Sequence, residues 1–126
     1  MISENQPVVG CIVNIPSTAL VEVLGLAGYH FLFIDSEHST LSLEQMEALI
    51  LAAELRGTVP IVRVPENNPK TILRVMDMGA MGIIIPDVST REEAEAAVRA
   101  AKYAPLGERG LATTRSADYG YGEKGA

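Results

Sequence analysis

Two polar positions that follow apolar, branched stretches of the sequence carry side chains suited to acid–base and anion-binding chemistry. The segment Asp35-Ser36-Glu37-His38 comes directly after one such stretch, and Arg63 stands near the end of another. A histidine has an unperturbed pKa near ~6.5, which suits a general base, although the same four residues could simply form a solvated loop. A guanidinium flanked by apolar residues needs an anionic partner, which could be a carboxylate side chain or an anionic substrate.

Four short apolar runs predict the strands that must position these side chains. They cover residues 8–13, 30–34, 59–64 and 82–85. Because the runs are nearly continuously apolar and do not alternate strictly, they favour a parallel sheet covered on both faces. Side chains alternate along a strand, so Arg63 shares a face with Ile61 and Asp35 shares one with Phe33. The sequence does not say which face points inward.

Segments with helical spacing separate the runs, and each begins at a residue that can cap a helix. The expected caps are Ser17, Ser42, Asn68 followed by Pro69, and Ser89 or Thr90. The expected ends lie near residues 25–28, at Gly57, before Gly79 and at Lys102. Strands that alternate with helices in this way indicate parallel pairing through right-handed crossovers.

This order predicts an α/β fold, a parallel (β/α)8 barrel of the TIM type, of which the chain supplies about the first four βα units. Such a barrel typically needs about 250 residues, so residues 1–126 would form the N-terminal half of one barrel domain, ending in a Gly-rich loop over about 104–126. An open half leaves two strand edges unpaired, so we expect either a fragment or an association of identical halves. Active sites of such barrels form at the carboxyl ends of the strands, where Asp35, Glu37, His38 and Arg63 are expected to lie.

The composition narrows the possible partners. A net charge of −6 argues against nucleic acid and anionic membranes, which attract clustered Lys and Arg. There is no secretion signal and no apolar run near the roughly 20 residues of a membrane span, so we expect a cytoplasmic protein. Cys11 is alone, which excludes a disulfide within the chain, and it is expected to be a buried core thiol without chemistry.

Six segments, in this order and spacing, resemble the HpcH/HpaI aldolases, which include the 4-hydroxy-2-oxoheptanedioate and 2-keto-3-deoxyglucarate aldolases. The segments are AGYHF at 27–31, DSEH at 35–38, VRVP at 62–65, MDMGA at 76–80, GIIIP at 82–86 and YAPLGERG at 103–110. Each segment alone is weak evidence, but together they extend over nearly the whole chain. The resemblance implies a class II pyruvate aldolase, a carbon–carbon lyase that cleaves a 4-hydroxy-2-oxo acid reversibly into pyruvate and an aldehyde.

The resemblance also assigns roles to residues. His38 matches the catalytic base, Arg63 the arginine that binds substrate and stabilises the enolate, and Asp77 the carboxylate that raises the basicity of the histidine. Because Asp77 precedes the fourth strand, it lies at the wrong end for His38 of the same chain, and a neighbouring subunit of a homo-oligomer, such as a hexamer, is expected to supply it. Asp35 and Glu37 would orient the histidine or metal-bound waters.

A divalent metal such as Mg²⁺ or Mn²⁺ is the cofactor that the resemblance implies. The family's metal ligands, a Glu and an Asp, belong to later strands, so no metal ligand is assigned within this chain, and activity of the chain by itself stays open.

Two alternative functions remain. One is a related lyase of the same barrel superfamily that acts on citrate or malyl thioesters. The other is a non-enzymatic α/β module of the flavodoxin-like or receiver-like type. That module needs a fifth strand, and a receiver also needs acidic residues after its first strand, where this chain has Asn14-Ile15-Pro16.

Overall fold

A computed structural model gives the structure of residues 6–121 and contains one parallel sheet. The four strands are hydrogen-bonded in the order β1-β2-β3-β4, with every neighbouring pair parallel. Their bounds are β1 (Gly10–Val13), β2 (Phe31–Asp35), β3 (Val59–Arg63) and β4 (Gly82–Ile84). The predicted strands and their parallel order are confirmed, although β1 begins two residues later than the apolar run that predicted it.

Four helices alternate with the strands, and their caps agree with the sequence pattern. The helices are α1 (Thr18–Leu26), α2 (Leu43–Leu55), α3 (Pro69–Asp77) and α4 (Arg91–Ala101). The side chain that accepts a backbone N–H at each start belongs to Ser17, Ser42, Asn68 and Thr90. Thr90 therefore caps α4, and Ser89 does not. Each cap satisfies a donor that would otherwise lack a partner in the first turn.

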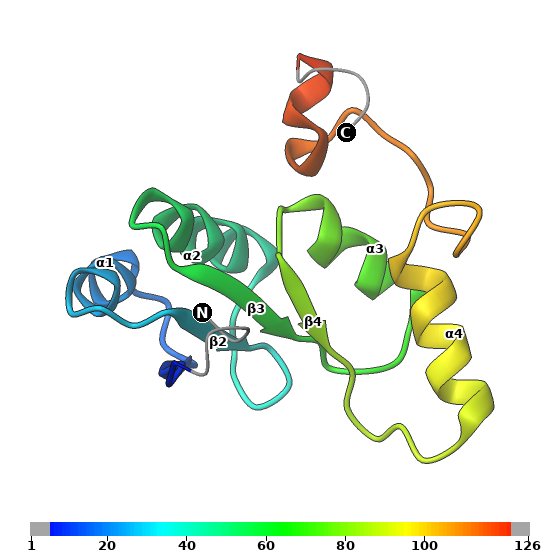
Figure 1. Ribbon diagram of the computed structural model, residues 1–126, viewed down its shortest axis with the longest axis horizontal. Coiled ribbons are helices and arrows are strands. Elements are labelled where there is room, and N and C mark those ends of the chain that lie inside the picture. The colour runs from blue at the N-terminus through cyan, green and yellow to red at the C-terminus, as the bar shows by residue number, and fades with distance from the viewer. Residues whose placement is uncertain (1–5, 122–126) are drawn as a thin grey trace.

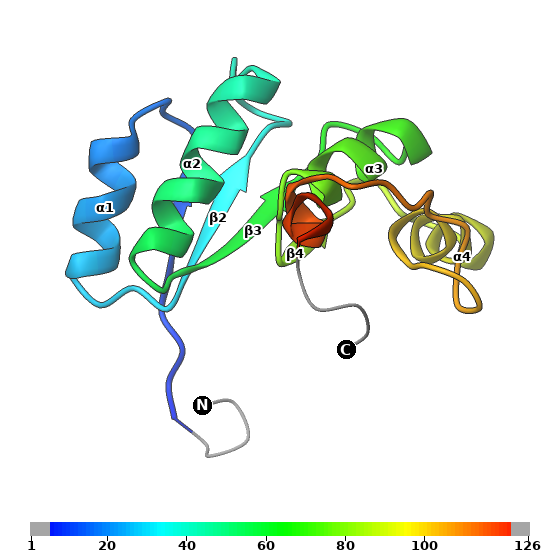
Figure 2. The ribbon, with the colours of Figure 1, turned by 90° about the horizontal axis from the view of Figure 1, so that it is seen from above.

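The helices cover one face of the sheet (Figure 1). Figure 2 shows α1 and α2 side by side near β2, with α4 at the other end of the sheet next to α3. Fully buried strand residues that face the helices include Leu32, Ile34 and Val62. Side chains alternate along each strand, so the intervening residues point to the other face, where Ile12 remains 61% exposed. Within residues 6–121 no helix covers that second face.

The last described segment is not a loop throughout, because it contains a short 3₁₀ segment. After α4 the chain runs on past α3 and forms this segment, η2 (Arg115–Gly120), which contacts α3. Figure 1 places η2 at the opposite end of the molecule from the turn between β4 and α4. The Gly-rich tail was expected to be a loop over about 104–126, and residues 122–126 of it lie outside the described residues.

Cys11 was expected to be a buried core thiol, but it is only partly buried, on β1 at the edge of this sheet. It still packs against the core. Among residues 6–121, no helix has the length and apolarity that crossing a bilayer requires.

Helix α2 offers a matched test of which side faces the core. Leu49 is 1% exposed and Leu51 is 47% exposed on the same helix. Leu49→Ala should lower the free energy of unfolding by about 2–5 kcal/mol, because it leaves a cavity in the packed core. Leu51→Ala should change it by less than about 0.5–1 kcal/mol. Equal losses in urea denaturation of the two variants would contradict the placement of α2.

Candidate active site

An ion pair between neighbouring strands forms the centre of the candidate site. Asp35 and Arg63 are register partners at the carboxyl ends of β2 and β3. Arg63 donates from Nε to Asp35 Oδ1 at 3.0 Å and from Nη2 to Oδ2 at 2.7 Å. This fork-to-fork geometry is the strong form of an arginine–carboxylate contact. Both side chains stand on the face that no described helix covers, since Asp35 follows Phe33 and Arg63 follows Ile61 in the alternation.

A second carboxylate and an aromatic ring also contact the guanidinium. Glu37 Oε2 lies 3.2 Å from Arg63 Nε, and the Phe33 ring centroid lies 5.2 Å from the guanidinium carbon. The Arg63 side chain nevertheless stays 25% exposed. None of the hydrogen bonds found within residues 6–121 uses its Nη1. The sequence left the anionic partner of Arg63 open between a carboxylate and a substrate. The structure shows a carboxylate partner and leaves Nη1 without a hydrogen bond among the described residues.

The loop that follows β2 is folded onto the same carboxylate. Asp35 Oδ1 accepts from the backbone N–H of Glu37 at 3.1 Å and of His38 at 3.2 Å. Ser36 and Ser39 each donate a hydroxyl to a backbone carbonyl at this edge, Ser36 to Arg63 and Ser39 to Asp35. The segment is therefore an ordered turn instead of a freely solvated loop.

The electrostatics keep the central pair charged. The hydrogen bonds from Arg63 hold the pKa of Asp35 below its ordinary value of 3.8, although burial acts in the opposite direction. The N–H groups of His38 and Glu37 lower the Asp35 pKa further. The same contact with Asp35 raises the pKa of Arg63. At neutral pH, Arg63 is thus a fixed cation that can stabilise negative charge and does not exchange protons.

His38 lies beside this pair, and its imidazole is largely exposed. Its side chain is 71% exposed, and its Nε2 lies 3.7 Å from Glu37 Oε2. The backbone of His38 is fixed by Asp35, while the ring is open to solvent or a ligand. The structure therefore brings together four of the candidate residues, Asp35, Glu37, His38 and Arg63, at one end of the sheet.

Asp77 does not join them. It is the last residue of α3 and precedes β4, so in a parallel sheet it lies at the end opposite the His38 turn. Its Oδ1 accepts a hydrogen bond of 2.6 Å from Nη2 of Arg109. Sequence reasoning did not single out Arg109. The only signal was its place in the segment at 103–110, where nothing distinguishes it from its neighbours.

The described residues do not by themselves fit a divalent-metal site. Among residues 6–121, no group of three or more His, Cys, Asp or Glu side chains lies close enough to hold an ion. Both oxygens of Asp35 are occupied by Arg63, and Glu37 faces the same guanidinium. A cation would have to compete with that guanidinium for each of these carboxylates.

Comparisons with known proteins agree on a family. Residues 9–119 match the family described as HpcH/HpaI aldolase/citrate lyase. The 5-keto-4-deoxy-D-glucarate aldolase of Escherichia coli is 36% identical over 117 residues, which cover 93% of this chain and 46% of that protein. The chain thus spans about half the length of the curated relatives that it matches.

Solved structures give the same result for the fold. The HpcH/HpaI aldolase from Desulfitobacterium hafniense DCB-2 superposes with a TM-score of 0.86 at 32% identity, over 94% of this chain and 46% of that one. The citrate synthase SbnG superposes with a TM-score of 0.83 at 40% identity, over 87% of this chain and 45% of that one. The four βα units therefore match about half of a TIM-type barrel, as the sequence predicted.

The Asp35–Arg63 pair predicts a pH-dependent stability. Because folding lowers the pKa of Asp35, its stabilising effect is complete above the ordinary value of 3.8 and is lost as the pH falls through the folded-state value. Asp35→Asn should therefore reduce the free energy of unfolding at pH 7 by roughly 1.5–3 kcal/mol, the size of a hydrogen bond to a charged group.

Denaturant unfolding at pH 7 and at pH 2.5 would measure this difference, with Glu22→Gln as the control, since Glu22 pairs with Arg56 at the surface. The control should show only a small loss at either pH. A deficit of Asp35→Asn that persists undiminished in acid would contradict the assignment.

Proposed function

The chain belongs to the HpcH/HpaI aldolase/citrate lyase family, and from this premise we propose that it supplies the acid–base and enolate-stabilising groups of a carbon–carbon lyase. The proposed reaction is reversible cleavage of a 4-hydroxy-2-oxo acid into pyruvate and an aldehyde. Its substrate class follows from the relatives named 5-keto-4-deoxy-D-glucarate aldolase. The expected location is the cytoplasm. The resemblance calls for a divalent cation, and the proposal assigns none of its ligands to residues 6–121.

The observation that carries the proposal is the guanidinium of Arg63, which Asp35 fixes at the strand ends while its side chain stays 25% exposed and its Nη1 makes no hydrogen bond within residues 6–121. In aldol cleavage a base removes the proton of the C4 hydroxyl, and the C3–C4 bond breaks. Its electron pair passes into an enolate whose negative charge accumulates on the C2 oxygen, and the aldehyde leaves. C3 then takes up a proton to give pyruvate. A cation that is already oriented before the charge develops stabilises that enolate without reorganising.

We assign the base to His38, acting on the hydroxyl directly or through water. Its ring is exposed beside Glu37, and its backbone N–H is bound to the carboxylate that also holds Arg63. Asp35 would therefore fix the relative positions of the imidazole and the guanidinium. This shared support suits a reaction in which proton removal and charge stabilisation occur on one substrate.

We also propose that Asp77 is the carboxylate that orients the histidine. Because it lies at the opposite end of the sheet from His38 of its own chain, the proposal requires a neighbouring subunit to supply it. A homo-oligomer, such as a hexamer, is thus part of the proposed active form.

Citrate chemistry is the second candidate. The citrate synthase SbnG shares 40% identity with this chain, more than the aldolase structure from Desulfitobacterium hafniense does. Both reactions pass through a carbon nucleophile next to a carbonyl, which the same guanidinium could stabilise. Assays with a 4-hydroxy-2-oxo acid and with citrate, run on the same preparation, separate the two candidates.

Arg63→Lys tests the function directly, because it keeps the positive charge but loses the fork that Asp35 binds. In the protein that carries this sequence, kcat for aldol cleavage should fall roughly 10²–10³-fold, the loss typical of one oriented donor. Pyruvate release in a coupled assay measures it, and thermal unfolding checks that the variant folds.

The matched control is Arg91→Lys, because Arg91 lies on the surface of α4 with a side chain that is 84% exposed. Its turnover should equal that of the unmodified protein. Unchanged turnover in Arg63→Lys would remove Arg63 from the mechanism.

A further inference from the structure

The segment after α4 runs past α3, and its last described part, η2, contacts α3. We call residues 102–121 the C-terminal strap. Two arginines of the strap hold it there. Arg115 binds Glu54 of α2 and donates from Nη1 to the carbonyl oxygen of Met78 at 2.9 Å. Arg109 binds Asp77. The Arg115–Glu54 and Arg109–Asp77 pairs lie close together. Only Arg109 binds a residue with a proposed catalytic role, Asp77.

The backbone around Arg109 is fixed to the end of α4. Arg109 N–H donates to the Lys102 carbonyl at 3.0 Å, and Glu108 N–H donates to that of Arg99 at 2.7 Å. Gly107 allows this approach, because a Cβ at that position would overlap the Lys102 carbonyl oxygen. The backbone of Arg109 is therefore fixed at the end of α4, and its side chain extends from there to Asp77 of α3.

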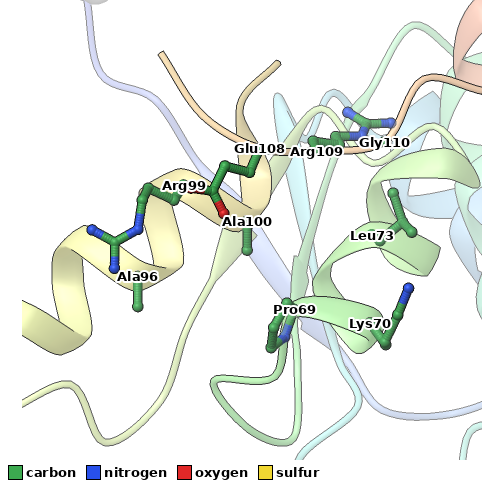
Figure 3. A pocket seen from close by; sticks show the side chains of 9 residues that line it. All are labelled: Pro69, Lys70, Leu73, Ala96, Arg99, Ala100, Glu108, Arg109 and Gly110. Atoms are coloured by element: carbon green, nitrogen blue, oxygen red, sulfur yellow. The ribbon is translucent and has the colours of Figure 1, made fainter. Parts of the chain in front are cut away.

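Figure 3 shows the cavity of about 430 Å³ between α3 and α4 that the strap crosses. Its walls are largely apolar, with Pro69, Leu73 and Ala100 among the lining residues. In the same view the guanidinium of Arg99 points away from α3, whereas that of Arg109 lies toward α3. These two guanidinium groups thus do not converge on the cavity, and Arg109 binds Asp77 at the end of α3.

The surroundings of Arg109 fix its guanidinium firmly. Its side chain is only 5% exposed, and the Tyr103 ring centroid lies 4.5 Å from the guanidinium carbon. Nη2 donates to Asp77 Oδ1 at 2.6 Å and to Ser116 Oγ at 3.1 Å. Nε is buried without an acceptor among residues 6–121. The guanidinium is therefore held by Asp77, Ser116 and Tyr103, while its Nε has no acceptor among the described residues.

The contact leaves Asp77 with one oxygen occupied and one available. Arg109 holds Oδ1, while no hydrogen bond found within residues 6–121 uses Oδ2, and the side chain is 19% exposed. A lone aspartate at the end of a helix would sample several rotamers. A carboxylate held through Oδ1 by a buried guanidinium is restricted in its rotamers, and its Oδ2 is not used by that contact.

We propose that Arg109 is a positioning residue that orients the Asp77 carboxylate for the imidazole of a neighbouring subunit's copy of His38. This inference rests on the proposed function, which assigns Asp77 to the base. It adds a residue that touches neither the substrate nor the histidine and acts through Asp77 alone. The rival explanation is that Arg109, like Arg115, only fastens the strap.

The experiment separates the two explanations with a double-mutant cycle. Arg109→Gln, Arg115→Gln, Asp77→Asn and the two doubles with Asp77→Asn are made in the protein that carries this sequence. The readouts are thermal unfolding and kcat/KM for aldol cleavage as a function of pH. Arg115→Gln is the matched control, because it releases the strap from Glu54 without touching Asp77.

If Arg109 positions Asp77, Arg109→Gln should lower kcat/KM roughly 10–100-fold, as the loss of a partner that orients a functional group does. The acidic limb of its pH profile should move to lower pH, as in Asp77→Asn, because an imidazole without an oriented carboxylate is less basic. The double variant with Asp77→Asn should be no slower than Asp77→Asn alone. Arg115→Gln should leave the limb in place and combine additively with Asp77→Asn. If Arg109→Gln fails to fold, Arg109→Lys keeps the buried charge and should give the same changes in smaller size.

Three results would overturn the inference. Arg109→Gln and Arg115→Gln could lower the melting temperature alike while both leave the pH limb unmoved, which would make both arginines fasteners of the strap. The losses of Arg109→Gln and Asp77→Asn could also be additive. Finally, Asp77→Asn could itself leave the profile unchanged. That result would remove Asp77 from the mechanism, whereas the Arg63→Lys assay would still report on the lyase reaction itself.

Discussion

The pairing of Asp35 with Arg63 is the interaction on which the candidate site depends. Asp35 is 4% exposed, and a carboxylate so buried is costly unless a cation and donors compensate it. Arg63 can do so only because β2 and β3 are parallel and in a register that sets the two residues opposite each other. A slip of one residue would turn one of the two to the helix side and break the pair. The ion pair and the sheet register therefore support each other.

The same carboxylate links the strand ends to the turn at residues 36–39. Asp35 Oδ1 accepts from Arg63 and from the backbone of Glu37 and His38, so the turn cannot move independently of the guanidinium. At the opposite end of the sheet a second arginine–aspartate pair, Arg109 with Asp77, fixes the end of α3. The chain thus has a fixed carboxylate at each end of its sheet, and the proposed active form uses both by bringing opposite ends of two copies together.

Local chemistry accounts for what the sequence could predict. The caps at Ser42 and Asn68 were readable because a cap and its helix lie within a few residues of each other. The placement of Asp35 and Arg63 at the carboxyl ends of parallel strands followed from the alternation of strands and helices. Their contact did not, since 28 residues separate them and the side of the strand that faces inward cannot be read from the pattern. Arg109 and Asp77 are 32 residues apart, and neither charge nor spacing marked them as partners. The family resemblance, and no physical pattern, drew attention to Asp77.

In the proposed reaction, Arg63 binds Asp35 and an anionic 2-oxo acid at the same time, with different nitrogens. A crystal structure of the protein that carries this sequence, soaked with pyruvate, tests it most directly. The expected result is a ligand oxygen within hydrogen-bonding distance of Arg63 Nη1, with Nε and Nη2 still bound to Asp35. Pyruvate bound away from Arg63, or a guanidinium that has left Asp35 to reach it, would contradict the account.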